Sequence, residues 1–467
     1  MIQEKIGKAL KEIKRSEFIR IVSHYDADGI SAAAVLLSAL TREGKKVHLS
    51  MEKQLKSKII EKLKKESPDL FIFSDLGSGQ IELLNELAKI TGRKIIILDH
   101  HLPSSVGENE NIIHINPCLE GKDEDEISGS GVAYLLAKTL NPKNKDLSYL
   151  AVIGAIGDIQ DINWKMNGMN ESLLEEAIKK RMLRKDKGIR LFGRMNRPLH
   201  KALEYSTDPY IPGVTGEESA AVQFLSSIGI RLKKDDGSWR TLSDLTDEEM
   251  KKLASAIICE RIRENETSPE EIFGDVYTLN LDGHEVDARE IATTLNACGR
   301  MGQAPLGVLY VLGVKSAFEK VEGILTGYRK MITRYINWIR DNKDKIVKTE
   351  SAYYILAEDQ IHENFIGTIT SICEKSIFND GRLVMGFAFT QDGEVKVSAR
   401  MSELLVKKGL NLKNFFKRIP KEYGYGGGHA AAGGAFIKRG KENEIINICE
   451  SYLKEVLGDQ YGRKNQR

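Results

Sequence analysis

The sequence is poor in cysteine, in aromatic residues and in long hydrophobic runs. Its five cysteines, at positions 118, 259, 298, 373 and 449, form no C-x-x-C pair. This distribution argues against a disulfide framework or a zinc ribbon and favours buried thiols. The longest apolar runs, such as Ala32–Leu37, are too short to cross a bilayer, and no signal peptide is visible. We therefore expect a cytoplasmic globular protein.

An excess of charge of one sign is also absent. The formal net charge is +2, although 29% of the residues are charged. A nucleic-acid partner would therefore have to bind a local basic patch rather than a globally basic protein. Among the few aromatic residues, Tyr423, Tyr425 and Phe436 flank a glycine-rich segment and could stack on bases, although core packing is their ordinary role. Abundant Lys and Glu with little Gln is typical of thermophile proteins.

The first part of the chain alternates predicted strands and helices. Several of the strands are continuous apolar runs, such as "LFIF" and "IIIL", which suit strands buried on both faces of a parallel sheet. Helices are predicted between them, and this alternation predicts a doubly wound α/β domain. The predicted strands are Phe18–Ser23, Lys46–Met51, Leu70–Ser74, Lys94–Leu98 and Ile112–Ile115.

The pattern changes from about residue 185. Residues 185–285 are rich in charge and predict mostly short helices, and Ser316–Val347 predicts one long connecting helix. From Ser351 onward, short strands around a glycine-rich loop predict a smaller α+β domain. The predicted divisions are a first domain over 1–189, an inserted helical region over 190–285, a return segment with the connecting helix over 286–347, and a last domain over 348–467.

Four polar clusters follow apolar segments of the first domain. They come after the first, third and fourth predicted strands and after the apolar helix "LAVIGAIG". The carboxyl ends of parallel strands share one edge of a sheet, where ligands bind, so we expect the clusters to converge there. Their members are His24, Asp26 and Asp28; Asp75; Asp99, His100 and His101; and Asp158.

So many carboxylates would raise one another's pKa and destabilise the fold unless cations neutralised them. Oxygen and imidazole ligands without thiolates favour Mn²⁺ or Mg²⁺ over zinc, and the histidines favour Mn²⁺. The ligands exceed the needs of one ion with open positions, so we predict two divalent cations that share one carboxylate, as in phosphoester hydrolysis. Taken alone, "DADG" could be a helix-capping turn and "DHH" a polar turn.

The motifs "HYDADG", Asp75, "DHH" and "GDIQD" resemble, in order and spacing, the four motifs of the DHH phosphoesterase superfamily. Near the other end, "YGYGGGHAAAGGAFI" (Tyr423–Ile437) resembles the GGGH motif of the DHH-associated C-terminal domain, with "VSAR" upstream like its substrate-binding strand. The length and the inserted region look most like the archaeal RecJ-like single-strand exonucleases, some of which associate with the GINS replisome complex. The resemblance therefore implies a metal-dependent phosphoesterase domain and a substrate-binding domain.

The resemblance also assigns roles to residues of the first domain. It implies that Asp75 bridges two ions and that His101 stands near the scissile phosphate, with Asp99 orienting a histidine. Asp161 is a second-ranked alternative to Asp158 as a ligand. Several bacterial RecJ proteins carry Asp where this chain has His24, so the affinity for the first ion is expected to differ. The implied ligands are His24, Asp26 and Asp75 for one ion, and Asp28, Asp75, His100 and Asp158 for the other.

The glycine-rich segment is a candidate phosphate-binding loop. Consecutive glycines let backbone N–H groups turn toward an anion, and the segment lacks the pattern of an ATP-binding P-loop. Arg400 offers a bidentate fork for phosphate, with a surface salt bridge as the ordinary alternative. Arg300, in "NACGRMG", is a weaker phosphate-contact candidate. The predicted substrate-binding set is Ser398, Arg400, Gly426, Gly427, Gly428, His429 and Arg300.

The predicted function is a two-metal-dependent exonuclease specific for single-stranded DNA or RNA, acting in replication or repair. The alternatives are an oligoribonuclease or cyclic-dinucleotide phosphodiesterase, and a replisome scaffold with little activity. The inserted region favours the nuclease, and the full set of ligand types argues against the scaffold. By resemblance, a GINS-type replisome protein would bind the inserted region, where we expect Leu245, Leu253, Ile257 and Ile258 to be incompletely buried.

Overall fold

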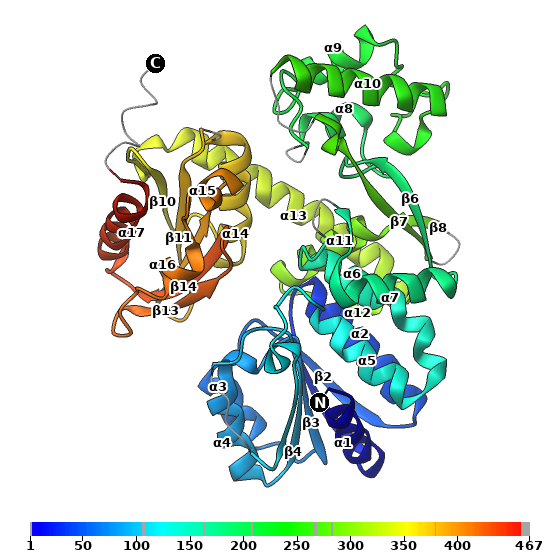
Figure 1. The fold of residues 1–467 in the computed structure, drawn as a ribbon, viewed down its shortest axis with the longest axis vertical. Helices are drawn as coiled ribbons and strands as arrows, with labels where there is room; N and C mark the ends of the chain where they lie inside the picture. The colour runs from blue at the N-terminus through cyan, green and yellow to red at the C-terminus, as the bar shows by residue number, and fades with distance from the viewer. Residues whose placement is uncertain are drawn as a thin grey trace. The chain divides into compact units, whose positions relative to one another are not determined.

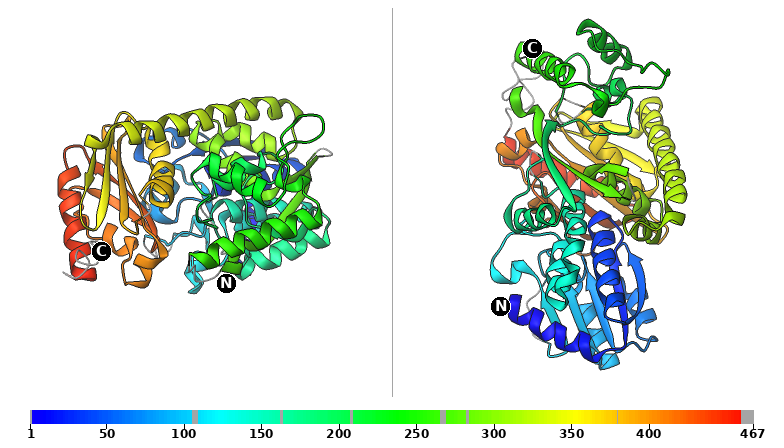
Figure 2. Two further views of the ribbon diagram at one scale, coloured as in Figure 1. Left: turned by 90° about the horizontal axis from the view of Figure 1, so that it is seen from above. Right: turned by 90° about the vertical axis from the view of Figure 1, so that its right-hand side faces the viewer.

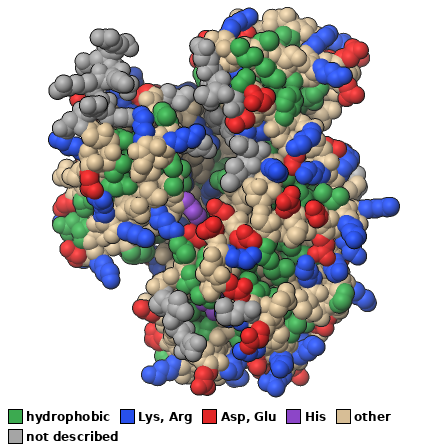
Figure 3. Space-filling view, in the orientation of Figure 1, with side chains coloured by type: hydrophobic (Ala, Val, Ile, Leu, Met, Phe, Trp, Pro, Cys, Tyr) green, Lys and Arg blue, Asp and Glu red, His purple; other side chains and the backbone are tan. Residues whose placement is uncertain are grey.

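The computed structural model describes residues 2–104, 109–161, 164–206, 209–264, 269–281, 284–378 and 380–458. The chain divides into two compact units, Met1–Leu325 and Thr326–Arg467. Within the described ranges, every helix falls short of the length and apolar character that crossing a bilayer requires. Acidic and basic side chains are interspersed on the visible surface of both units, as the small net charge implies (Figure 3).

A five-stranded parallel sheet forms the centre of the first unit (Figure 1). The strand order is β2-β1-β3-β4-β5. The strand β1 therefore lies between β2 and β3, where the strand order of the sheet reverses. All five strands coincide closely with the predicted ones, and the doubly wound α/β fold is confirmed. Their bounds are Phe18–His24 (β1), Lys46–Glu52 (β2), Leu70–Ser74 (β3), Lys94–Leu98 (β4) and Ile112–Ile115 (β5).

Helices cover both faces of this sheet. On one face, Ile21 and Ile72 share a core with α1 (Ile2–Arg15), α2 (Ala27–Arg42) and α5 (Gly129–Leu140). On the other face, Phe71 and Phe73 pack with α3 (Ser57–Leu63) and α4 (Ile81–Thr91). Successive side chains of a strand point to opposite faces, so β3 is buried along its whole length and its sequence is apolar throughout. The helix α6 (Ser148–Gly157) packs against α2 and α5.

A three-stranded antiparallel sheet follows α7 (Gly168–Lys179), where the sequence predicted mostly short helices. It consists of β6 (Leu183–Ile189), β7 (Phe273–Leu281) and β8 (His284–Asp287). The charged residues in the middle of β6 are solvent-exposed, so no apolar alternation marks this strand in the sequence. Figure 2 shows β6 and β7 as a ribbon that leads to the helical part of the insertion.

The helices between β6 and β7 have a hydrophobic core of their own. They are α8 (Leu199–Glu204), α9 (Glu218–Ser227) and α10 (Asp247–Arg263). Leu253 and Ile257 of α10 are fully buried in this core, whereas Leu245 and Ile258 are partly buried. The expectation of incomplete burial was therefore wrong for Leu253 and Ile257, because the loops around α8 and α9 supply enough apolar partners to cover them.

Three helices follow the insertion: α11 (Ala288–Arg300), α12 (Ala304–Val311) and α13 (Lys315–Asp341). The long helix α13 is the predicted connecting helix, but it ends earlier than expected. Asn342 terminates it, and Ile346–Lys348 form the short strand β9 instead of a last helical turn.

The second unit contains a six-stranded sheet in the order β13-β14-β12-β11-β10-β9, which confirms the α+β expectation. Only β10 and β11 are parallel neighbours. The glycine-rich segment, expected to be a loop, forms the edge strand β13 (Gly424–Gly428). The other elements are β10 (Ala352–Glu358), α14 (Glu363–Ile372), β11 (Leu383–Phe389), β12 (Glu394–Arg400), α15 (Glu403–Lys407), α16 (Leu412–Phe416), β14 (Ala432–Lys438) and α17 (Glu442–Leu457).

Candidate metal centre

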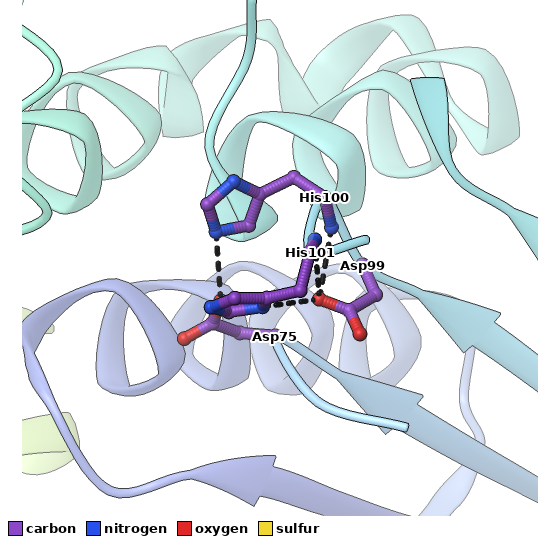
Figure 4. Close-up of side chains that lie close together, drawn as sticks. All are labelled: Asp75, Asp99, His100 and His101. Carbon is purple, nitrogen blue, oxygen red and sulfur yellow. Dashed lines mark hydrogen bonds and ion pairs between the residues drawn. The ribbon is translucent and has the colours of Figure 1, made fainter. Parts of the chain in front are cut away.

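Asp75 follows β3 directly and contacts two of the predicted ligand groups. Its Oδ2 lies 3.3 Å from His24 Nδ1. Its Oδ1 lies 3.5 Å from His100 Nε2 (Figure 4). The φ angle of Asp75 is 57°, in the left-handed region that Asp enters more readily than most residues. The backbone therefore turns sharply at the end of the strand, and the two carboxylate oxygens meet different histidines.

His24, Asp26 and Asp75 form the first candidate ligand cluster, in which one possible donor atom from each lies within 4.8 Å of the others. His24 Nδ1 is 3.0 Å from Asp26 Oδ2. The other oxygen of Asp26 accepts the N–H of Gly29 at 3.0 Å and caps α2. A Cβ at Gly29 would lie 2.2 Å from the carbonyl oxygen of His24, so this turn requires glycine. "DADG" thus caps α2 and also supplies members of both candidate ligand clusters.

Asp28, His100 and Asp158 form the second cluster by the same criterion. His100 Nε2 lies 3.5 Å from Asp158 Oδ2 and 3.9 Å from Asp28 Oδ2. Asp28 belongs to α2, and its carboxylate lies at the N-terminus of α5. There the N–H groups of Gly129 and Ser130 donate to it at 2.6 and 3.0 Å. The partial positive charge of a helix N-terminus favours the ionised carboxylate there.

Two glycines allow backbone to approach these carboxylates. A Cβ at Gly129 would lie 2.6 Å from Asp75 Oδ1, and a Cβ at Gly154 would lie 2.3 Å from Asp28 Oδ1. Any larger residue at either position would displace a ligand oxygen. The glycines of α5 and α6 therefore determine where Asp28 and Asp75 lie.

The histidines of the "DHH" motif are held in different ways. His100 Nδ1 lies 2.8 Å from the carbonyl oxygen of Glu124, so it carries the proton and Nε2 faces the carboxylates. His101 Nδ1 lies 2.8 Å from Asp99 Oδ1 (Figure 4). Asp99 also accepts the N–H groups of Ser78 and His100, so its orientation is fixed. Asp99 thus contacts His101, the arrangement expected of an orienting carboxylate.

The electrostatics of the two clusters fit divalent cations. Burial, together with the charge of Asp75, raises the pKa of Asp28 to about 7, and burial raises the pKa of Asp158 to about 6. Burial opposes protonation of His24 and His100, but the surrounding carboxylates outweigh it and hold the pKa of each well above its ordinary value. Asp75 Oδ1 and His100 Nε2 are buried without a hydrogen-bond partner among the described residues. Oxygen and imidazole donors of this kind suit Mn²⁺ or Mg²⁺.

Three family models match the chain, and their descriptions agree with these motifs. The DHH family N-terminal domain covers residues 18–156, the DHH-CID domain 191–272 and the DHHA1 domain 351–455. An uncharacterized protein of Methanocaldococcus jannaschii is 35% identical over 98% of both chains. The chain belongs to the DHH family.

RecJ proteins are further relatives of this DHH protein. The single-stranded-DNA-specific exonuclease RecJ of Thermus thermophilus is 30% identical over 37% of this chain, which corresponds to 26% of RecJ. The structure of that RecJ in complex with Mn²⁺ matches with a TM-score of 0.61 at 18% identity, over 97% of this chain and 55% of RecJ. Another structure of it contains Mg²⁺. CDC45 from Entamoeba histolytica matches with a TM-score of 0.58 at 13% identity, over 97% of this chain and 98% of CDC45.

These likenesses show a shared fold, and the relatives suggest a nuclease or phosphoesterase. The DHH-CID match falls between the end of β6 and the start of β7, which is where the helical part of the insertion lies. The chain spans about half the length of the Thermus RecJ structure.

Asp161 lies outside both ligand clusters of the DHH domain. Its carboxylate forms an ion pair with Arg289 of α11, and the Arg289 guanidinium lies 4.2 Å from the ring centroid of Trp164. Asp158, in contrast, lies beside His100. The structure therefore places Asp158, and not Asp161, among the candidate ligands.

Sequence reasoning missed several residues that hold this centre together. Gln160 Nε2 donates to Asp158 Oδ2 at 2.9 Å, and Asn296 Oδ1 accepts the N–H of Ala27 at 3.1 Å. Gln160 lies within "GDIQD" and Asn296 within "NACGRMG", so both stretches carried a signal. Arg300 ends α11 beside Gly299, where a Cβ would lie 2.0 Å from the carbonyl oxygen of Tyr25. Arg300 thus comes directly after the residue at which α11 packs against the backbone of Tyr25, between His24 and Asp26.

The other predicted substrate-binding residues belong to the DHHA1 domain. Ser398 and Arg400 lie on one face of β12, and Arg400 Nη1 is 3.2 Å from Ser398 Oγ. Gly427 of β13 pairs with Gly434 of β14, which in turn pairs with Ser398, so Gly427 lies on the same face as Ser398. Gly426 and Gly428 lie on the opposite face, because successive residues of a strand alternate between faces. His429 begins the turn between β13 and β14, and its N–H donates to the carbonyl oxygen of Ala432 at 2.8 Å.

Proposed function

We propose that this protein is a two-metal-dependent nuclease that removes nucleotides from the end of single-stranded DNA or RNA, in replication or repair. The observation that supports it most is that the carboxylate of Asp75, a member of the first candidate cluster, also faces His100 of the second. One of its oxygens lies beside His24 and the other beside His100. A carboxylate placed between two donor sets is the arrangement that two-metal phosphodiester hydrolysis requires.

The proposed cofactors are two divalent cations, with Mn²⁺ preferred and Mg²⁺ possible. When bound, they would lower the pKa of a water molecule and neutralise charge on the phosphate. Asp75 Oδ1 and His100 Nε2 are buried and face each other at 3.5 Å without a hydrogen bond among the described residues, so an ion could satisfy both atoms. One ion would be held by His24, Asp26 and Asp75, which form one candidate cluster. The other would be held by Asp28, His100 and Asp158, which form the second, together with the Asp75 oxygen that lies beside His100.

His101 is the proposed proton donor. Burial opposes its protonation, but the carboxylate of Asp99 raises the pKa of His101 to about 9. The side chain of His101 is 44% exposed, so its outer nitrogen can reach a substrate. Held by Asp99, the imidazolium would donate a hydrogen bond to the phosphate and a proton to the oxygen that leaves.

The DHHA1 domain is proposed to hold the strand. Ser398 and Arg400 present a hydroxyl and a guanidinium on the same face of β12, and the glycine edge strand offers backbone N–H groups without side chains in front of them. Contacts of this kind recognise phosphate and sugar rather than base identity. The Thermus relative is a single-stranded-DNA-specific exonuclease, which supports a single strand as the substrate.

The inserted region is proposed to bind a protein of the GINS type. It has a separate core, and Ile262, Tyr205 and Trp239 remain 57%, 53% and 45% exposed. Figure 3 shows hydrophobic side chains gathered on the visible face of this region, surrounded by charged ones. Because the fold also matches CDC45, a replisome scaffold with little activity is the second candidate, and the intact ligand set favours the enzyme.

The decisive experiment is digestion of 5′-labelled and 3′-labelled single-stranded DNA and RNA with Mn²⁺, with Mg²⁺ or with EDTA. We expect a ladder of products from one end with either ion, faster with Mn²⁺, and no products in EDTA. Full turnover in excess chelator would contradict the two-metal proposal. Hydrolysis of dinucleotides alone would indicate a small-molecule phosphodiesterase, and partner binding without hydrolysis would indicate the scaffold.

A further inference from the structure

One face of the DHHA1 sheet carries two parallel rows of residues across β12, β14 and β13. The strand pairing places Lys396 opposite Phe436, and Phe436 opposite Tyr425. We call these three residues the aromatic row. Two positions along, the same pairing aligns Ser398, Gly434 and Gly427, which we call the glycine row. Side chains two residues apart on a strand point to the same face, so both rows share one surface.

The aromatic row is an ordered stack with an exposed end. The rings of Tyr425 and Phe436 lie 5.7 Å apart at an interplanar angle of 29°, and Lys396 Nζ lies 4.2 Å from the centroid of Phe436. Phe436 is buried, whereas Tyr425 is 47% exposed. An aromatic residue that only fills a core would be covered. Tyr425 instead packs on the ring of the buried Phe436, while about half of its own side chain faces solvent.

The glycine row gives a ligand room to lie against the sheet. Nothing lies within 4 Å of the position that a Cβ at Gly427 would occupy. The helix α14 approaches the same face over β12, where a Cβ at Gly367 would lie 3.3 Å from Ser398 Oγ and 3.6 Å from Arg400 Nη2. Over β14, a Cβ at Gly434 would lie 3.4 Å from Lys396 Nζ, so the open strip lies over β13 and the Lys396 ammonium borders it on the β14 side. Arg400 lies on the same face farther along β12, and both residues are cations.

The spacing of the rows matches a nucleic-acid chain. Two residues along a strand span about 6.6 Å, a length similar to one step of an extended single strand. A phosphate held at Ser398 and Arg400 would therefore have a neighbouring nucleotide over the aromatic row, where Lys396 can attract a phosphate and Tyr425 can receive a base. Stacking on aromatic rings beside a basic groove is the general way in which proteins bind single strands without reading their sequence.

We propose that Tyr425, supported by Phe436, is a stacking platform for a base of a single-stranded nucleic acid, next to the nucleotide held at Ser398 and Arg400. This rests on the proposed function and adds a second nucleotide-binding position to it. The platform favours chains of several nucleotides over mononucleotides. It accepts any base, because every base has a π-face.

The test measures binding by the full chain in EDTA, which prevents hydrolysis, with fluorescein-labelled single-stranded DNA and RNA of ten nucleotides. We expect Tyr425→Ala to weaken binding of both about tenfold or more, and Tyr425→Trp to keep it. The added tryptophan should lose emission when the strand binds, relative to the wild type with its three native tryptophans. Ile90→Ala, which removes an exposed hydrophobic side chain of α4, is the control and should bind like the wild type.

Several results would overturn the proposal. Wild-type affinity in Tyr425→Ala, or unchanged emission in Tyr425→Trp on binding, would do so while the proposed function stood. A wild-type chain that neither binds nor cleaves single strands would overturn both. If gel filtration showed a wild-type dimer that Tyr425→Ala converts to a monomer, with unchanged nucleic-acid binding, a second copy of the chain would be the occupant of this face.

Discussion

Gly154 packs so closely against Asp28 that a Cβ on the glycine would lie 2.3 Å from Asp28 Oδ1. The position of a candidate metal ligand is therefore controlled by the absence of one methyl group on a neighbouring helix. The same Cβ would also lie 2.0 Å from Ser130 Oγ, so it has no direction in which to be accommodated.

We expect Gly154→Ala to displace Asp28, weaken Mn²⁺ binding and abolish hydrolysis. Overpacking should also lower the free energy of unfolding by about 1–3 kcal/mol. Isothermal titration with Mn²⁺ and chemical denaturation measure the two effects. Gly7→Ala is the control, because Gly7 also lies within a helix but has nothing within 4 Å of a Cβ. It should leave activity unchanged and stabilise α1 by about 0.5–1 kcal/mol. Wild-type Mn²⁺ affinity in Gly154→Ala would contradict the packing argument.

Asp75→Asn should abolish turnover while the fold survives. Asn tolerates the left-handed backbone at this position, and loss of one acid relieves repulsion in the metal-free protein. Loss of a residue that only supports a metal ligand lowers activity by up to about a hundredfold. Because Asp75 is the proposed ligand of both ions, we expect its loss to lower the rate by more than that. Single-turnover rates and metal-free melting temperatures should be measured together.

Asp186→Asn, which removes an exposed carboxylate of β6, is the control for that experiment and should match the wild type in both measurements. A well-folded Asp75→Asn variant with a near-normal rate would rule out Asp75 as the shared ligand.

The inserted region can be removed where its two ends meet. Ile189 pairs with Phe273 in the β6–β7 ladder, so an Asn-Gly turn can replace residues 190–272 and close a hairpin. We expect this variant to keep metal-dependent hydrolysis and to lose capture of a GINS-type partner in a pull-down. Lost hydrolysis in a folded variant that still captures the partner would show that the insertion serves catalysis instead.

The stability of the inserted region should depend on pH through Arg240 and Glu249. The two guanidinium Nη atoms donate to the Glu249 carboxylate at 2.7 and 2.6 Å. These bonds, with the N–H of Thr246, lower the pKa of Glu249 to about 2 from its ordinary 4.5. A lowered pKa means that the pair stabilises the fold above pH 4.5 and that this contribution declines as the pH falls toward 2.

Glu249→Gln should therefore be less stable than the wild type at pH 7. A charged hydrogen-bonded pair contributes about 1.5–3 kcal/mol to the free energy of unfolding, and the partial exposure of this pair reduces that value. The difference between the two proteins should shrink between pH 4.5 and 3. Urea denaturation followed by tryptophan fluorescence measures it, since the ring of Trp239 lies 4.6 Å from that of His200 in this region. Asp235→Asn removes a carboxylate that is 91% exposed and should change nothing. A difference that is constant with pH would exclude the titration of Glu249 as its cause.

The parallel sheet could be predicted because burial on both faces leaves uninterrupted apolar runs such as β3. The candidate ligands could be named because they follow those strands or, for Asp158, the apolar helix α6. β6 carries its charges toward solvent and β13 is largely glycine, so neither has a side-chain pattern that identifies a strand. The pairing of Asp161 with Arg289 joins residues 128 positions apart, and only the tertiary structure brings them together. Gly129 and Gly154 resemble ordinary helix residues in the sequence, and their role depends entirely on which carboxylate lies opposite.

The hydrogen bonds from α5 to Asp28 have a consequence for ion selection. With both oxygens of Asp28 held by backbone N–H groups and Nδ1 of His100 held by a carbonyl, these side chains have little rotamer freedom left to lose. A rigid frame cannot expand around a large ion. If this centre binds the proposed ions, we expect it to discriminate by size and to disfavour Ca²⁺, which needs more ligands at longer distances.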